Sequence, residues 1–140
     1  MESLSRYGHT ILGILRIVAG LLFMQHGVQK LFGWLGGPQA ELMSLLGLAG
    51  VFEMFGGLLI VLGLLTRPVA IVLAGEMLVA YFMAHLPQGF WPLQNGGELA
   101  LLYLVIFLYL ATAGPGRFAI DGARGKESAV VDAEPVAPTT

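Results

Sequence analysis

The sequence contains no cysteine and few charged residues. Of its 140 residues, 7 are lysine or arginine and 9 are aspartate or glutamate, so that 11% are charged, against roughly a quarter in an ordinary soluble domain. The missing cysteine excludes disulfides, thiolate metal sites, Cys-ligated iron–sulfur clusters and CxxC redox chemistry. The net charge of −2 provides no basic surface for nucleic acid.

Apolar residues dominate what is present. They make up 56% of the chain, and the mean hydropathy is +0.80. A globule of this size has too much surface to cover with so few charges, and the length allows one domain. The composition therefore indicates a small polytopic membrane protein whose first partner is the lipid bilayer.

Four apolar stretches approach the roughly 20 residues that a transmembrane helix needs. We predict an all-α integral membrane fold, a four-helix transmembrane bundle with spans at about 9–32, 41–65, 68–86 and 97–113. Glycine and proline separate the spans, and residues 87–97 form a Pro/Gly-rich outer loop. Residues 1–124 then make one membrane domain, and residues 125–140 a disordered cytoplasmic tail.

Positive charge gathers on one side of this arrangement. The N-terminus, the turn between the second and third spans and the C-terminal segment carry five cations, whereas the other side has Lys30 alone. The positive-inside rule therefore predicts that both termini are cytoplasmic. The five cations are Arg6, Arg67, Arg117, Arg124 and Lys126.

Glycines recur along the first two spans, where small residues let membrane helices approach closely. We interpret them as packing positions. Glu53 follows Gly50 by three residues and precedes Gly57 by four, so it shares their face and is expected to point into the bundle. The glycines are Gly13, Gly20 and Gly27 in the first span and Gly50, Gly56, Gly57 and Gly63 in the second.

Ionisable residues at membrane depth are the most informative feature. A charge at mid-membrane costs roughly 2.5–3.5 kcal/mol on the mildest scale, so such residues are paired, face a cavity or serve a function. By depth, we expect Arg16 to pair with Glu76, Glu53 or both, and Lys30 with Glu98. The predicted polar column consists of a deep part (Arg16, Glu53, Glu76) and an outer part (His26, Lys30, Glu98).

Two interpretations of this column stay open. The groups are either ion pairs that fix helix register or the lining of a proton-coupled or ligand-binding cavity. With three carboxyl groups facing two fixed cations, a desolvated carboxyl must stay protonated or share a proton with His26. His26 and His85 lie at different depths, which argues against haem. The sequence has no HExxH, Walker A or GxGxxG motif, and we predict no metal site.

Several separated segments closely resemble the DoxX family. They are RIVAGLLFMQHGVQKLFGWLGG, GVFEMFGGLLIVLGLLTRP, AGEMLVAYFMAHLPQGFWPLQNGGELALLY and GPGRF, in order, and the resemblance covers about residues 15–121. It implies a bacterial inner-membrane protein of four helices. The family name comes from the small membrane subunit of a thiosulfate:quinone oxidoreductase, and other members resemble parts of oxidoreductase complexes or of defence against quinones, thiols and oxidative stress.

The resemblance and the polar column agree on a quinone as a candidate ligand, because a quinone is apolar, enters from the bilayer and needs proton donors when it is reduced. The favoured hypothesis is a quinone-linked oxidoreductase subunit with a soluble or membrane partner subunit, in which homo-oligomers also remain open. A small-solute permease and a non-catalytic structural partner are the alternatives. The candidate site residues are Glu76, Glu53 and Arg16 as catalytic groups, His26, Lys30, Glu98, Tyr81 and Tyr103 as ligand-binding groups, and Tyr109 as a further hydroxyl donor.

Overall fold

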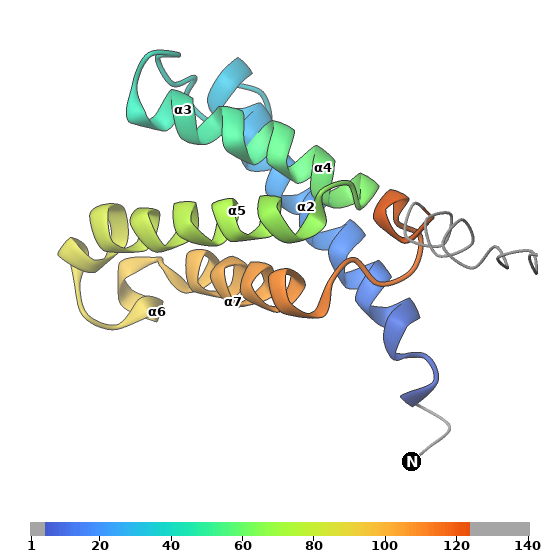
Figure 1. The fold of residues 1–140 in the computed structure, drawn as a ribbon. Coiled ribbons are helices and arrows are strands. Elements are labelled where there is room, and N and C mark those ends of the chain that lie inside the picture. Colours follow the sequence, from blue (N-terminus) through green and yellow to red (C-terminus); the bar gives the residue numbers. More distant parts are fainter. Residues whose placement is uncertain (1–4, 124–140) are drawn as a thin grey trace, which may run out of the picture.

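The computed structural model describes residues 5–123, and this part of the chain contains helices and no strands (Figure 1), which confirms the all-α class. A π-helical turn, η1, joins α3 to α4 in one continuous rod, and a second, η2, extends α5. The predicted tail at 125–140 and the cations Arg124 and Lys126 lie outside the described residues. The elements are α2 (Gly8–Phe32), α3 (Leu45–Val51), η1 (Phe52–Gly56), α4 (Gly57–Leu62), α5 (Thr66–Ala80), η2 (Tyr81–His85), the 3-10 turn η3 (Leu86–Gln88), α6 (Pro92–Asn95) and α7 (Glu98–Ala113).

Three helical runs are long and apolar enough to cross a membrane: Gly8–Phe32, Leu45–Leu62 and Thr66–Gln88. The fourth, Glu98–Ala113, has 16 residues and spans roughly 24 Å, less than the ~30 Å hydrocarbon core. Large apolar side chains are exposed along all these runs, as lipid contact requires. The chain is therefore a membrane protein, whereas the fourth span and the orientation of the termini stay predictions.

Two boundaries differ from the prediction. The second span was expected from about residue 41, but α3 begins after Ser44, whose side-chain oxygen accepts a hydrogen bond from the Gly47 amide at 3.1 Å. This is an ordinary N-cap, and it ends the helix in that direction. The predicted loop at 87–97 contains the single helical turn α6, whose Asn95 is only 3% exposed.

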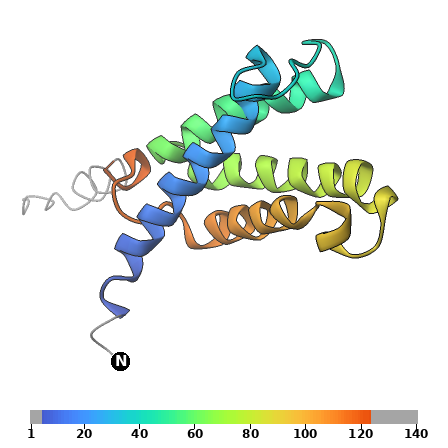
Figure 2. The same cartoon turned by 180° about the vertical axis from the view of Figure 1, so that it is seen from behind.

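The helices are arranged as two pairs. α5 lies along α7, and α2 lies along the α3–η1–α4 rod, while α2 and α7 touch little (Figures 1 and 2). Phe23 of α2 joins the pairs, because its ring packs edge-on against Tyr103 and Phe107 of α7 at centroid distances of 4.9 and 4.8 Å. The core lies at this junction, and towards α3 the rod diverges from α5 (Figure 1).

Glycine lets α2 approach the rod closely, as predicted. A Cβ atom on Gly27 would lie 2.7 Å from the Gly50 carbonyl oxygen, and one on Gly20 would lie 2.9 Å from that of Gly57. Real Cβ atoms do not approach so near, so these positions exclude any larger residue without a backbone shift. The same packing turns Glu53 inward, and its exposed fraction of 3% confirms the predicted orientation.

The C-terminal segment, residues 114–123, folds back over the ends of the helices. The Asp121 carboxylate accepts hydrogen bonds from the amides of Leu65 and Thr66 at 2.9 and 2.8 Å. These amides open α5, and Leu65 has a positive φ of 51°, which only a few per cent of non-glycine residues adopt. Asp121 therefore caps α5 from a distant part of the chain and holds the tight turn before it.

Candidate functional site

Arg16, expected in the deep part of the polar column, is fully buried at 0% exposure and binds backbone carbonyls. Its Nη1 donates to the carbonyl oxygens of Ile60 and Val61 at the end of α4. Its other nitrogens donate to three carbonyls of the C-terminal segment: Nε to Pro115 at 2.8 Å, and Nη2 to Arg117 at 3.2 Å and Phe118 at 2.8 Å.

The predicted pairing of Arg16 with Glu76 or Glu53 is therefore wrong. A guanidinium has five N–H donors, and here carbonyl oxygens accept all of them. The carboxylate that acts electrostatically on Arg16 is that of Asp121. In the structure Arg16 fastens α2 to α4 and to the C-terminal segment, away from both acidic residues.

Lys30 and Glu53 form the ion pair at the centre of the candidate site. The Lys30 ammonium donates to Oε1 of Glu53, so the predicted pair of Lys30 with Glu98 is wrong. The Lys30 side chain is 28% exposed and that of Glu53 4%, while Glu53 Oε2 is buried without a hydrogen-bond partner in the described part of the chain. Glu98 is exposed at the first position of α7.

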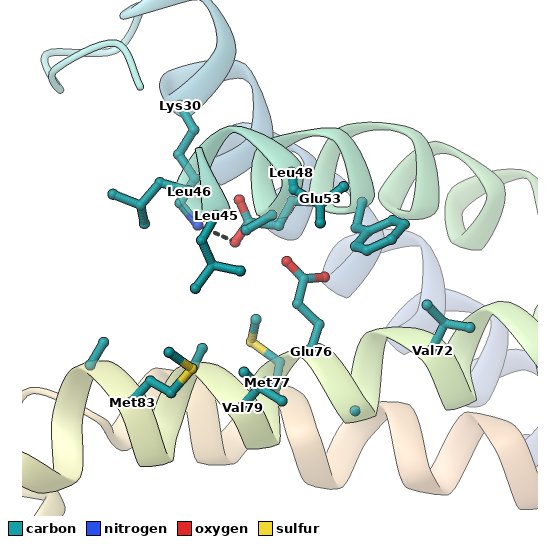
Figure 3. Close-up of a pocket in the computed structure, with 15 residues that line it drawn as sticks. Lys30, Leu45, Leu46, Leu48, Glu53, Val72, Glu76, Met77, Val79 and Met83 are labelled. Atoms are coloured by element: carbon teal, nitrogen blue, oxygen red, sulfur yellow. Dashed lines mark hydrogen bonds and ion pairs between the residues drawn. The ribbon is translucent and has the colours of Figure 1, made fainter. Parts of the chain in front are cut away.

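Glu76 faces this pair from the opposite helix. Figure 3 shows its carboxyl group rising from α5 towards Glu53 across the gap between α5 and the rod. Both Glu76 carboxyl oxygens are buried, and within residues 5–123 neither has a hydrogen-bond partner. Glu53 and Lys30 act on it electrostatically. Two carboxyl groups and one ammonium therefore make a compact charge cluster, which matches the predicted gathering of Glu53 and Glu76.

A cleft of about 280 Å³ lies between the rod and α5, with Glu76 in its floor. Its remaining walls are apolar, and several wall residues, among them Phe52, Val79 and Met83, are exposed on the outer face of the helices. In a membrane that face meets lipid, so the cleft opens to the bilayer. Its polar groups are Lys30, Glu53 and Glu76 (Figure 3).

A second cavity, of about 290 Å³, lies on the other side of the Lys30–Glu53 pair. We call it the inner cavity. It is lined by His26 from α2, His85 from η2 and Tyr103 from α7, together with the ion pair itself. The His26 and Tyr103 rings meet edge-on at a centroid distance of 6.1 Å. Three of the predicted ligand-binding residues, His26, Lys30 and Tyr103, thus share one cavity.

The remaining predicted residues lie elsewhere. Tyr81 is buried and stacks on His85 at a centroid distance of 6.3 Å, but it lines neither cavity. Glu98 lines neither cavity, and Tyr109 is 53% exposed on the outer surface of α7. The structure thus brings Lys30, Glu53, Glu76, His26 and Tyr103 together, and leaves Arg16, Glu98 and Tyr109 outside.

Both π-helical turns lie at the site. η1 carries Glu53, and η2 begins with Tyr81 and ends with His85. Single π turns inside α-helices occur frequently at functional sites, because the extra residue changes which side chains face inward. The sequence gives no signal for them.

Sequence analysis assigned no role to Asn95, which shapes the loop beside the inner cavity. Its side-chain nitrogen donates to the Gly89 carbonyl at 2.7 Å, and its Oδ1 accepts from the Gly97 amide at 2.8 Å. The Asn95 carbonyl lies 3.1 Å from Nδ1 of His85. An asparagine before two glycines is typical of a turn, but this pattern does not reveal the contact with His85.

Some relatives of the chain are named as membrane proteins. A model of the DoxX family matches residues 11–86. An uncharacterized Haemophilus influenzae protein is 42% identical over 128 residues, which cover 86% of this chain and 96% of the relative. The inner membrane protein YqjF of Escherichia coli is 33% identical, over 77% of this chain and 87% of its own length.

A third relative carries a functional name. CatD of Bacillus subtilis, provisionally named an oxidoreductase, is 29% identical over 115 residues, which cover 77% of this chain and 82% of CatD. No solved structure gives a significant match to this chain.

Proposed function

The chain belongs to the DoxX family, and we propose that it is a quinone-linked subunit of a membrane oxidoreductase in the bacterial inner membrane. The observation that carries the proposal is Glu76, a buried carboxyl group that has no hydrogen-bond partner among residues 5–123 and lies in the floor of an apolar cleft that opens to lipid. The name of CatD and the inner-membrane assignment of YqjF support it.

The cleft fits the ring of a quinone. Its volume of about 280 Å³ is close to the lower end of small-molecule pockets, roughly 300–1,000 Å³. A ring with a long apolar tail therefore fits with the ring inside and the tail in the bilayer. The orphaned Glu76 oxygens supply the polar contact that such a ring needs, and the apolar walls match its faces.

Glu76 acts in this proposal as the hydrogen-bond donor to a ring oxygen. Lys30 is already neutralised by Glu53, and an unpaired charge at this depth is unfavourable, so the resting form of Glu76 is the neutral acid. A bound quinone would supply the electron-accepting ring. Glu76 would hold the ring oxygen and give it a proton, while the apolar walls exclude water from the exchange.

The electrons need a second protein. The chain has no cysteine, and no residues among those described gather as a metal centre. We therefore propose a partner oxidoreductase subunit as electron donor, with this chain as the quinone-binding anchor. Arg16 has a structural role in this proposal, and the predicted four spans and cytoplasmic termini are retained.

The test is quinone content after purification in mild detergent. Organic extracts of wild type, Glu76→Met, which has no hydrogen-bond donor, and the matched control Glu41→Met are compared by mass spectrometry, with extracts of membranes that lack the protein as background. Glu41 is exposed and lines neither cavity. We expect stoichiometric quinone in wild type and Glu41→Met, and about tenfold weaker retention in Glu76→Met, the value of one hydrogen bond at ~1.4 kcal/mol.

Two results would contradict the proposal. Quinone at background level in wild type would show that the cleft takes another ligand or none, and that the charge cluster fixes helix register. Equal retention in wild type and Glu76→Met would show that the quinone binds elsewhere on the protein.

A further inference from the structure

The inner cavity has no part in binding the ligand of the cleft, yet it contains most of the titratable side chains of the site. We infer that it is a proton-exchange chamber, and that protons pass between it and Glu76 through the Lys30–Glu53 pair. The purpose of this exchange rests on the proposed function, but the exchange itself is acid–base chemistry and needs no ligand.

The first argument is the common wall of the two cavities. Four residues line both the cleft and the inner cavity, namely Lys30, Glu53, Met77 and Ala80. Met77 and Ala80 have no group that exchanges a proton. Among the described residues, the Lys30–Glu53 pair is thus the one ionisable connection between the two spaces.

The second argument is that much of the cleft mouth faces lipid. Its mouth opens between exposed apolar residues such as Phe52, Val79 and Met83, and in a membrane these meet lipid tails. Lipid supplies no protons. Across that face a carboxyl group in the floor of the cleft renews its proton through the protein, and Figure 3 shows Glu53 as the group that faces Glu76.

The third argument is the chemistry of the inner cavity. His26 and His85 come from different helices and both line it, and imidazole is the side chain that most readily exchanges protons near neutral pH. Lys30 acts electrostatically on His26, and Glu53 on Tyr103. The inner cavity also reaches Gly96, beside the loop that holds His85, so it extends to the loop end of the bundle.

The exchange balances as follows. When Glu76 gives its proton to an oxygen of a ligand, one O–H bond breaks on Glu76 and one forms on the ligand. The Glu53 carboxylate then accepts a proton from an imidazolium N–H of the inner cavity, gives it to the Glu76 carboxylate and returns to its carboxylate form beside Lys30. The imidazole that lost the proton takes up another from water. One proton has crossed from the inner cavity to the cleft, the cluster has regained its starting charge, and no electrons have moved.

The experiment measures hydrogen–deuterium exchange at Glu76 in the full-length protein. The protein is reconstituted without quinone into vesicles of phosphatidylethanolamine and phosphatidylglycerol, and transferred to deuterium oxide. Infrared spectroscopy follows the isotope shift of the C=O stretch of the neutral Glu76 acid, which is assigned by its loss in Glu76→Gln.

Three variants test the route. His26→Gln combined with His85→Gln removes both imidazoles and retains an amide near the Asn95 carbonyl. Ala100→Phe fills the inner cavity, which Ala100 lines, without changing an ionisable group. His9→Gln is the matched control, because His9 is exposed at the far end of α2 and lines neither the cleft nor the inner cavity.

We expect exchange at Glu76 to become roughly a hundredfold slower in the double histidine variant, the lower range of what positioned acid–base groups contribute. Ala100→Phe is expected to slow it as well, and His9→Gln to leave it unchanged. Unchanged exchange in the first two variants, or no neutral-acid band in wild type, would overturn the inference. This experiment contains no quinone, so it is independent of the quinone-retention test. If exchange is slowed in the variants but the purified protein retains no quinone, the proton-exchange chamber stands and the quinone proposal fails.

Discussion

Replacing Arg16 with lysine tests whether its carbonyl bonds hold the helices together. Arg16→Lys preserves the positive charge but reduces the number of N–H donors from five to three, so at least two of the five carbonyl bonds are lost. Hydrogen bonds to charged groups are worth about 1.5–3 kcal/mol each, and those inside membrane proteins lie at the low end of their range. We therefore expect a loss of about 3 kcal/mol.

The assay is unfolding in mild detergent with increasing dodecyl sulfate, followed by circular dichroism. Arg6→Lys is the matched control, because Arg6 is exposed and donates to the neighbouring Tyr7 hydroxyl, and we expect it to be neutral. Trypsin provides a second readout, since the bond after Arg117 should be cut faster in Arg16→Lys once the C-terminal segment is released. If Arg16→Lys lowers the free energy of unfolding by less than about 1 kcal/mol, and trypsin cuts after Arg117 no faster than in wild type, the structural role of Arg16 is refuted.

Three further predictions use the same unfolding assay. Gly27→Ala should destabilise the protein by about 1–3 kcal/mol, because the added Cβ overlaps the backbone of the rod. Gly75→Ala is the control: Gly75 has open space around it, so this variant should be neutral or stabilising by up to ~1 kcal/mol. Equal effects of the two variants would contradict the close packing at Gly27. Asp121→Asn should cost about 1 kcal/mol by weakening the cap on α5, and no change would show that the cap is redundant. Lys30→Met and Glu53→Gln should each destabilise more than their combination, because each single variant leaves a charge or acid unpaired; additive losses would exclude the pairing.

The packing of the first two helices was predictable because its signal lies in residue identity. Glycine is small wherever it occurs, and Gly27 and Gly50 recur on helical faces that the 3.6-residue period brings together. The same period predicted that Glu53 points inward, and the structure agrees. Helix boundaries were less exact, because α4 ends at Leu62, before the expected residue 65, and α5 begins at Thr66, two residues before Pro68.

The partners of Arg16 could not be read from the sequence, because backbone carbonyls carry no residue signature. Depth alone suggested a carboxylate partner, but the nearest acceptors are the free carbonyls at the end of α4 and in the C-terminal segment. Lys30 was assigned to Glu98 by depth, yet Glu53 reaches it within η1, and a π turn leaves no pattern in composition. The cleft and the inner cavity depend on how the helix pairs diverge, which no local motif encodes.

The bonds of Arg16 also determine the order in which the protein can mature. Its partners Pro115, Arg117 and Phe118 follow it by 99 to 102 residues, so the ribosome must make almost the whole described chain before they exist. Until then Arg16 has only its two carbonyl partners in α4, and the start of α5 lacks the Asp121 cap. Biogenesis therefore has a late locking step, and a nascent chain stopped before residue 115 remains an open target for membrane quality-control proteases.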